Sequence, residues 1–169
     1  KNAPPSGFLA LCTANLPEPA IPLPSEHFNT VLYTGNGGTK TVSGVGFQPG
    51  FTWIKNRPAA DFHVLTDSNR GVTKTLSSNY GNSTGQSGVS TGYEQTYSNG
   101  LTAFNSDGFV VGSQEEFNTN NENFVSWNWK TGSNASNTDG DYTTSVSVNN
   151  TAGFSVMTYT GYGYPAGGQ

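Results

Sequence analysis

The feature that most constrains the fold is a stretch in the second half of the chain, 124–130, in which successive residues alternate between two sets. One set is Val125, Trp127 and Trp129, and the other is Phe124, Ser126 and Asn128. Successive side chains of an extended strand point to opposite faces of a sheet, so this alternation predicts a β-strand. Residues 142–148 alternate in the same way and predict another strand.

The composition extends this expectation to the whole chain of 169 residues, which is long enough for one domain with a core. Charged residues make up 11% of it, against about 25% in an ordinary protein. Gly, Ser, Thr and Asn replace them, and these residues favour turns, while Thr also suits strands. The aromatic fraction of 12% is too high for a disordered chain. We therefore expect an all-β, antiparallel domain with many turns.

Further short strands are expected where apolar residues lie between Gly-, Asn- and Pro-rich turns. They are 28–35, 39–44, 51–55, 62–66, 101–104, 109–112 and 154–160. Asp107-Gly108 is a strong turn signal for a hairpin between two of them. This spacing is typical of a sandwich or a barrel. The segments 76–99 and 131–140 are interpreted as an exposed loop and a turn-rich loop, and no helix longer than a turn is expected.

The chain divides into a Pro-rich N-terminal arm (1–26), a β domain (27–152) and a C-terminal strand with its tail (153–169). The arm holds an apolar run that is expected to be buried on this domain or on a neighbouring subunit. The C-terminal segment 154–163 repeats the pattern of 28–37, so we interpret it as an orphan strand, used on another subunit or continued in a longer chain. The assembly candidates are Phe8, Leu9, Leu11, Phe154, Val156, Tyr159, Tyr162 and Tyr164.

Charge and cysteine content exclude several classes of function. The net charge is −4 with seven Lys and Arg residues, so no basic patch is available for nucleic acid. The single cysteine, Cys12, allows no intrachain disulfide and no cysteine-based zinc site, and we expect it to be a buried small hydrophobe. No run of 18 apolar residues exists, so no membrane insertion is expected. No cofactor is expected.

The most suggestive polar cluster lies between residues 46 and 71, where two expected strands flank Pro58. Its members are Lys55, Arg57, His63, Asp67 and Arg70. One interpretation is a patch that binds a sugar or an acidic partner. The other, which we favour, is an ion-pair network that fixes the loop ends, with Asp67 paired to Arg57 or Arg70 and with Gly71 in a turn.

Paired carboxylates offer no convincing catalytic site, so we expect no enzyme. Asp139 and Asp141 have the right spacing, but Gly140 and the Asn residues around it indicate a turn. Glu115 and Glu116 are adjacent and would point to opposite faces of a strand. Asn137, Asp139 and Asp141 could offer oxygens to calcium, but a plain Asx-rich turn is the favoured interpretation.

The aromatic residues separate into expected core and expected surface. Trp53, Trp127 and Trp129 are interpreted as structural and buried, because alternating Trp residues on strands are more often core. Tyr80, Tyr93 and Tyr97 lie in the expected loop 76–99 and are the candidates for contacting a ligand.

Several motifs resemble a domain of tail fibres and other virion-surface proteins of bacteriophages, marine ones especially. They are Gly46-Phe47-Gln48-Pro49, Trp53-Ile54-Lys55-Asn56-Arg57, His63-Val64-Leu65 with Asp67 and Arg70-Gly71, Ser106-Asp107-Gly108-Phe109, Phe124-Val125 with Trp127 and Trp129-Lys130, and Gly153-Phe154-Ser155-Val156. The run 5–17 resembles the end of a preceding SPRY-like domain.

The resemblance implies a concanavalin-like jelly-roll β-sandwich on the virion surface and no enzyme. Our first interpretation is a structural fibre, filament or decoration subunit that self-assembles through its terminal arms, with other copies or other virion proteins as partners. The alternative is a carbohydrate-binding module for adhesion to host surface glycans. A glycan hydrolase is the third hypothesis.

Overall fold

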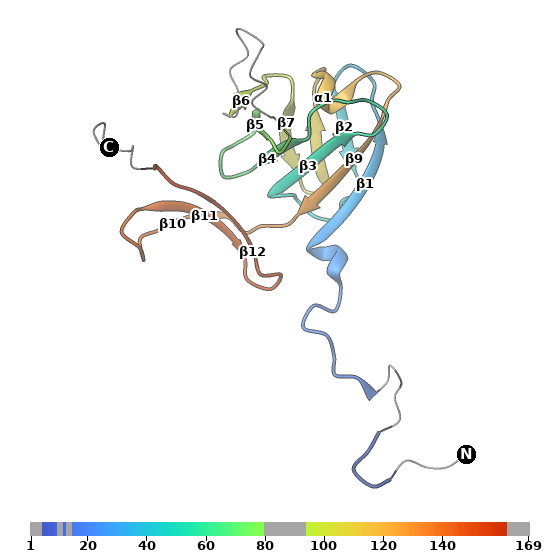
Figure 1. Cartoon of the computed structure of the whole chain (residues 1–169), viewed down its shortest axis with the longest axis vertical. Helices are drawn as coiled ribbons and strands as arrows, with labels where there is room; N and C mark the ends of the chain where they lie inside the picture. The colour runs from blue at the N-terminus through green and yellow to red at the C-terminus, as the bar shows by residue number, and fades with distance from the viewer. Residues whose placement is uncertain (1–4, 10–11, 13–14, 80–93, 162–169) are drawn as a thin grey trace, which may run out of the picture.

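The computed structural model describes residues 5–9, 12, 15–79 and 94–161. The described residues form mostly β-structure (Figure 1). The strands are β1 (Phe28–Thr34), β2 (Lys40–Ser43), β3 (Phe51–Asn56), β4 (Val64–Asp67), β5 (Lys74–Ser77), β6 (Gln95–Thr96), β7 (Leu101–Asn105), β8 (Gly108–Val111), β9 (Asn123–Trp129), β10 (Asn134–Asn137), β11 (Thr144–Asn149) and β12 (Phe154–Thr158). The helices are the 3₁₀ turn η2 (Pro24–Glu26) and the short α1 (Glu115–Asn118). No helix in this described part is both long and apolar enough to cross a membrane.

Three antiparallel sheets organise these strands. The largest has six strands in the order β1-β9-β3-β4-β5-β6, and the second has the order β2-β8-β7. The third is the meander β10-β11-β12, which extends from one side of the body in Figure 1. All strand pairs are antiparallel, as the composition predicts.

The first two sheets share one hydrophobic core. Its members are Tyr33, Val42, Val45, Phe47, Ile54, Val64, Leu101, Phe109, Val111, Phe117 and Phe124. Tyr33 joins the two sheets, since its ring stacks on Phe124 at 5.1 Å and meets Phe109 edge-on at 6.1 Å. Its hydroxyl donates to the Phe117 carbonyl at 2.6 Å, and burial raises the pKa of this phenol far above its usual value. The core thus includes a satisfied polar group.

The core-facing side of the six-stranded sheet is only half apolar. Beyond the core cluster it carries small polar side chains that are fully or almost fully buried, namely Thr52, Thr66, Thr75, Ser126 and Asn128. Asn128 donates to the Ser126 carbonyl and hydroxyl and to the Asn29 carbonyl, and the hydroxyls of Thr66 and Thr75 lie 3.4 Å apart. Such residues fill little volume, and their polar atoms need partners within the protein.

Most expected strands form, including the antiparallel pair of β3 and β4 and the hairpin of β7 and β8. The prediction of two loops was wrong in part, because both segments contain strands. The segment 76–99 includes the end of β5 and all of β6, and 131–140 includes β10. These strands are polar, and they form by pairing: β5 pairs with β4, β6 with β5, and β10 with β11. Residues 80–93 of the expected loop lie outside the described residues.

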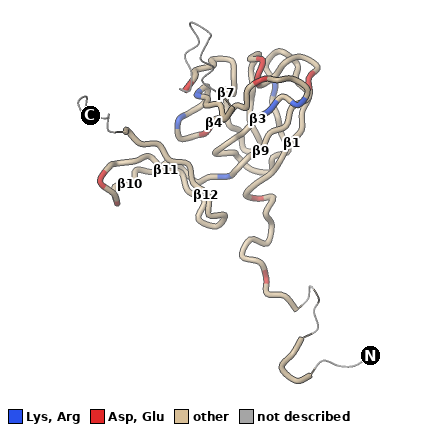
Figure 2. The backbone as a smooth tube through the Cα atoms, in the orientation of Figure 1, with Lys and Arg blue, Asp and Glu red and all other residues tan. Residues whose placement is uncertain are grey.

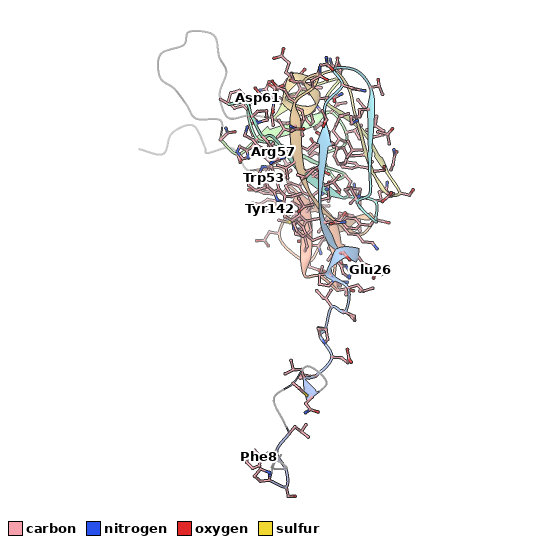
Figure 3. The ribbon with its side chains drawn as sticks, turned by 90° about the vertical axis from the view of Figure 1, so that its right-hand side faces the viewer. Phe8, Glu26, Trp53, Arg57, Asp61 and Tyr142 are labelled. Carbon is pink, nitrogen blue, oxygen red and sulfur yellow. The ribbon has the colours of Figure 1, made fainter. Side chains whose placement is uncertain are left out.

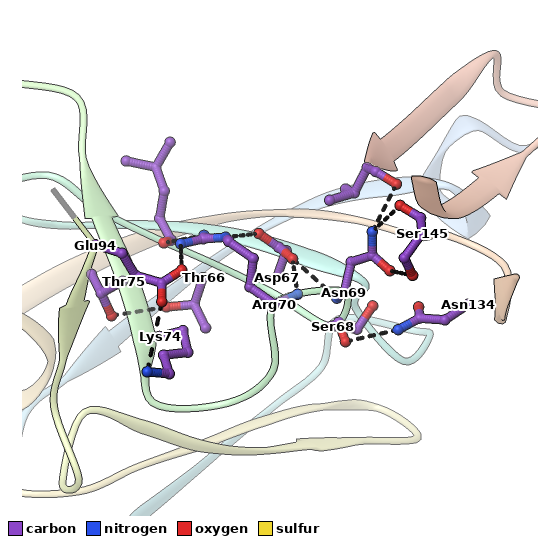
Figure 4. Close-up of polar contacts among 12 residues, drawn as sticks. Thr66, Asp67, Ser68, Asn69, Arg70, Lys74, Thr75, Glu94, Asn134 and Ser145 are labelled. Atoms are coloured by element: carbon purple, nitrogen blue, oxygen red, sulfur yellow. Dashed lines mark hydrogen bonds and ion pairs between the residues drawn. The ribbon is translucent and has the colours of Figure 1, made fainter. Parts of the chain in front are cut away.

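The C-terminal segment predicted to be an orphan strand is paired within the chain. As β12 it pairs with β11, with Val148 opposite Ser155 and Asn149 opposite Phe154. Both copies of the sequence repeat form strands, but β1 pairs with β9 in the large sheet and β12 joins the small meander. The small sheet contacts the body through Asn69, whose amide donates to the Ser145 carbonyl at 2.6 Å (Figure 4).

The described residues before η2 project away from the body (Figures 1 and 3). Phe8 is 70% exposed, and Leu9 and Leu16 are exposed as well. The described apolar side chains of this arm are therefore not buried against the domain. Cys12 is exposed, so its expected place in an apolar interior was wrong.

Candidate functional site

The outer side of the six-stranded sheet, opposite the core, carries large apolar side chains in cross-strand rows. One row runs from Trp127 on β9 through Trp53 on β3 and Leu65 on β4 to Leu76 on β5. A second row places Trp129 on β9 between Phe28 on β1 and Phe51 on β3. We call these seven residues the aromatic face: Phe28, Phe51, Trp53, Leu65, Leu76, Trp127 and Trp129. All seven are half-buried or exposed.

The expectation that the three Trp residues lie in the core was wrong. In β9 the set that contains Phe124, Ser126 and Asn128 is fully buried, and the set with Trp127 and Trp129 is on the outer side. Alternation establishes that the two sets lie on different faces but not which face is inside. The set with Phe124 faces the second sheet, and the set with the two indole rings faces away from it.

One end of the aromatic face is covered and the other is open. At the covered end Phe154 of β12 stacks on Trp129 with the ring centres 5.7 Å apart, and it also meets Phe51 at 6.1 Å. At the open end Trp53 and Trp127 contact edge to face at 5.8 Å. The open end offers the half-exposed indole rings of Trp53 and Trp127.

A histidine holds the Trp53 ring in place. The indole Nε1 donates to His63 Nδ1 at 2.9 Å, across the β3–β4 pair. Burial, and then the positive charge of Lys55, lower the pKa of His63 from its usual value. Both effects favour the neutral imidazole, which is the form that accepts the indole hydrogen bond. Lys55 Nζ donates to the carbonyls of Asn56 and Ala59 at 2.5 and 2.7 Å.

The remaining members of the expected polar cluster lie elsewhere. Of the two partners considered for Asp67, the structure places Arg70 beside it, with Nε 2.5 Å from Oδ2 (Figure 4). Arg57 lies exposed beyond the end of β3. Arg70 also donates to the Leu65 carbonyl at 2.9 Å and lies 3.4 Å from Glu94. The Asp67 carboxylate accepts two backbone N–H bonds from the turn that follows, which ends at Gly71 with a φ of +98°.

The structure thus divides the cluster into two parts with different surroundings. Lys55 and His63 flank the aromatic face, while Asp67 and Arg70 are tied to a turn. Charged residues are sparse over the whole body (Figure 2). The Asp67–Arg70 pair follows the favoured ion-pair interpretation, while Lys55 bonds to main-chain carbonyls and His63 to Trp53.

The other site candidates are scattered. Tyr97 packs its ring 6.3 Å from Phe117, against the core. The Asn137 amide donates to Asp139 at 3.1 Å and its oxygen accepts from the Asp139 backbone, as in an Asx turn. Val156 is half-buried on β12 and Tyr159 is exposed beyond it. The candidates outside the described residues are Leu11, Tyr80, Tyr93, Tyr162 and Tyr164.

One constellation was missed from the sequence. Asp61 and Glu122 converge on the side chain of Asn56 at the end of β3. The two carboxylates are far apart in the chain, so no spacing pattern could have revealed them. Glu115 and Glu116 lie in the first turn of α1, not on a strand as assumed. The described residues hold no group of three or more His, Cys, Asp or Glu side chains that could bind a metal.

Comparison with known proteins identifies the family. The family model described as a domain of unknown function, DUF7483, matches residues 23–167, so the chain belongs to this family. The match extends across the expected boundary between the β domain (27–152) and the C-terminal segment (153–169), and it includes the third sheet. Residues 1–22 lie outside the match. No curated protein and no solved structure matches the chain.

Proposed function

We propose that this chain is a non-enzymatic module of a virion-surface protein, in a fibre, filament or decoration subunit, and that it binds carbohydrate through the open end of the aromatic face. We further propose that the two sheets with a common core are a concanavalin-like jelly roll. The observation that carries the binding proposal is the pair of half-exposed indole rings of Trp53 and Trp127, supported on a rigid sheet.

The physical match to a sugar rests on surface shape and polarity. The C–H side of a sugar ring is flat and apolar and packs on an aromatic ring, while its hydroxyls need hydrogen-bond partners at the edge. A contiguous exposed apolar patch on a protein usually marks an interaction site. Both rings project from strands of one sheet, and His63 also fixes the Trp53 ring, so little conformational entropy is lost on binding. The sequence resemblance supports the surface location.

The test is a glycan array followed by titration calorimetry with the best glycan. Trp53→Ala and Trp127→Ala should each weaken binding by about tenfold or more, which corresponds to ~1.4 kcal/mol. Tyr159→Ala is the matched control, because Tyr159 is an exposed aromatic residue beyond β12 and outside the aromatic face. The proposal fails if no glycan binds at millimolar concentration, or if both Trp variants bind as tightly as the wild type.

A second candidate function is self-assembly through the N-terminal arm. The exposed side chains of Phe8, Leu9 and Leu16 favour it, since such groups gain free energy when a neighbouring subunit covers them. Removal of residues 1–22, which precede the family match, should leave a folded domain that has fewer chains per particle in light scattering than the full chain. An unchanged number of chains per particle would exclude the arm as the contact.

A further inference from the structure

The strand β1 forms one margin of the six-stranded sheet and is paired on one side, with β9 (Figure 1). Just beyond its two ends, the Lys130 N–H donates to the His27 carbonyl and the Gly35 N–H to the Glu122 carbonyl, both at 2.8 Å. Hydrogen-bonded residues alternate along an antiparallel pair, so the odd-numbered residues of β1 bond to β9. The backbone N–H and C=O groups of the other four residues point to the open margin of the sheet. These residues are Phe28, Thr30, Leu32 and Thr34.

This outward row of backbone groups is almost entirely unpaired within the described part of the chain. One hydrogen bond reaches it there, from the Thr30 N–H to Oδ1 of Asn29 at 2.9 Å. The side chains of the row lie on the same side of the sheet as the aromatic face, and Leu32 is 63% exposed. An unpaired row of main-chain donors and acceptors is a template for pairing with another strand.

The other margins of the first two sheets carry the usual protection against such pairing, which is a very short strand, a charge, a proline or a bulge. The opposite margin of the large sheet is β6, which has two residues, and its neighbour β5 begins at Lys74. In the second sheet β2 begins at Lys40, and β7 has a register shift between Leu101 and Ala103.

The strand β1 has none of these protections. It has seven residues, no charge and no proline, and its register with β9 is unbroken. The third sheet ends in β12, which is also uncharged but has five residues. Among the described strands, β1 is therefore the longest edge that is open to another chain.

We propose that β1 pairs antiparallel with β1 of a second copy of this chain about a two-fold axis. A self-pair matches one open row with an identical row, and no like charges meet because the strand has no charged residue. With the axis at Val31, all four outward residues of each copy are paired. Thr30 then lies opposite Leu32 of the second copy, and its N–H exchanges the bond to Asn29 for one to that Leu32 carbonyl.

The same pairing covers the exposed apolar side chains of the edge. Diagonal neighbours across an antiparallel pair are about 7–8 Å apart, which is within reach of long side chains. Leu32 therefore lies beside Leu32 and Phe28 of the second copy, and it loses exposed apolar surface. Symmetry supplies these apolar partners, which favours a second copy over an unrelated strand.

The dimer places both aromatic faces on one side. Directly opposed residues of an antiparallel pair project to the same side of the sheet, so the two copies form one continuous sheet, with six strands from each. A glycan with repeated units then contacts both faces, and its apparent affinity exceeds that of one face. This consequence rests on the proposed carbohydrate binding, whereas the dimer itself does not.

Analytical ultracentrifugation of the full chain over a range of concentrations tests the dimer. A single strand pair is at the low end of specific interfaces, so we expect dimerisation to depend on concentration. Leu32→Lys places a charge on the exposed edge and should weaken dimerisation by about tenfold or more. Met157→Lys is the matched control, because it makes the same kind of change at an exposed residue of β12, and it should behave as the wild type does.

Cysteine cross-linking tests the contact without relying on its affinity. Thr30→Cys and Leu32→Cys chains, both with Cys12→Ser, are mixed and oxidised in air. Opposed Cα atoms of a hydrogen-bonded pair are about 5.5 Å apart, which allows a disulfide. The mixture should form covalent dimers. Met157→Cys with Cys12→Ser is the control and should not.

Three results would overturn the proposal. The first is a wild type that stays monomeric up to millimolar concentration. The second is a Leu32→Lys variant that keeps the wild-type number of chains per particle, which is the result expected if the N-terminal arm alone assembles the chain. The third is the absence of covalent dimers from the mixture and from either cysteine variant alone, or equal cross-linking of the Met157→Cys control.

Discussion

The inner and outer faces of the six-stranded sheet invert the usual distribution of side chains. On β9 the inner positions after Phe124 are Ser126 and Asn128, both fully buried, while the outer positions are Trp127 and Trp129, both half-exposed. Burial of large apolar groups is the main source of folding free energy. The indole rings on the outer side contribute less to this term than fully buried rings would. The inner face holds the core, and the outer face is the surface for which we propose a contact with carbohydrate.

The largest expected effect separates the two faces directly. Phe124→Ala removes a completely buried ring that stacks on Tyr33, and it should lower the free energy of unfolding by about 3–5 kcal/mol. Urea denaturation measures this loss. The control is Trp127→Ala on the same strand, which should lose less than half as much because its ring is half-exposed. Equal losses would show that the outer face is a second core.

The next effect concerns Asp67, an acidic side chain that is buried at the end of β4. Arg70→Ala leaves the Asp67 carboxylate, whose side chain is 5% exposed, without its cationic partner. We expect a loss of about 2–4 kcal/mol, because the uncompensated charge stays buried. Lys74→Ala is the matched control, since Lys74 is an exposed neighbour 3.6 Å from Glu94 and should change stability by about 0.5 kcal/mol or less. A small effect of Arg70→Ala would mean that water reaches Asp67.

The covered end of the aromatic face offers a smaller test. Phe154→Ala removes the ring that packs on Trp129 and Phe51, and it should reduce global stability by only about 1–2 kcal/mol. Amide hydrogen exchange in β11 and β12 should accelerate more than exchange in β8, because the third sheet opens locally. Met157→Ala, an exposed position on β12, is the control. If amide exchange in β8 accelerated as much as in β11 and β12, the third sheet would not open independently of the body.

The smallest effect is expected from pH. The pKa of His63 is lower in the folded protein than in the unfolded chain, so the unfolded state binds more protons as the pH falls. The contribution of His63 to the free energy of unfolding is therefore complete above the pKa of about 6.5 in the unfolded chain, and it is lost as the pH falls through and below that value. Tryptophan fluorescence should change over the same range, because protonated His63 cannot accept from Trp53. In His63→Gln this change should vanish, and its persistence would assign it to another group.

Local sequence patterns were sufficient where neighbours in the chain determine the geometry. The Asp107-Gly108 turn joins β7 and β8 as expected, and the Asp107 carboxylate accepts from the backbone of Gly44 and Gly46 at 3.0 and 2.6 Å. These two bonds lower the pKa of Asp107. The contact of Asp67 with Arg70 spans three residues, so the sequence could propose it. The turn and the Asp67–Arg70 contact depend on short-range geometry, whereas the bonds from Gly44 and Gly46 to Asp107 join residues 63 and 61 positions apart.

The sequence by itself determined that the chain is mostly β, where most of its strands lie and which residues share a face. Those properties follow from the two-residue period of a strand and from turn chemistry. Only the tertiary structure decided which face of β9 is buried, that the polar segment Lys74–Ser77 is a strand, and that Asp61 and Glu122 meet at Asn56. The physical reason is that burial, strand pairing and the approach of distant side chains depend on the packing of one sheet against another, which no local pattern encodes.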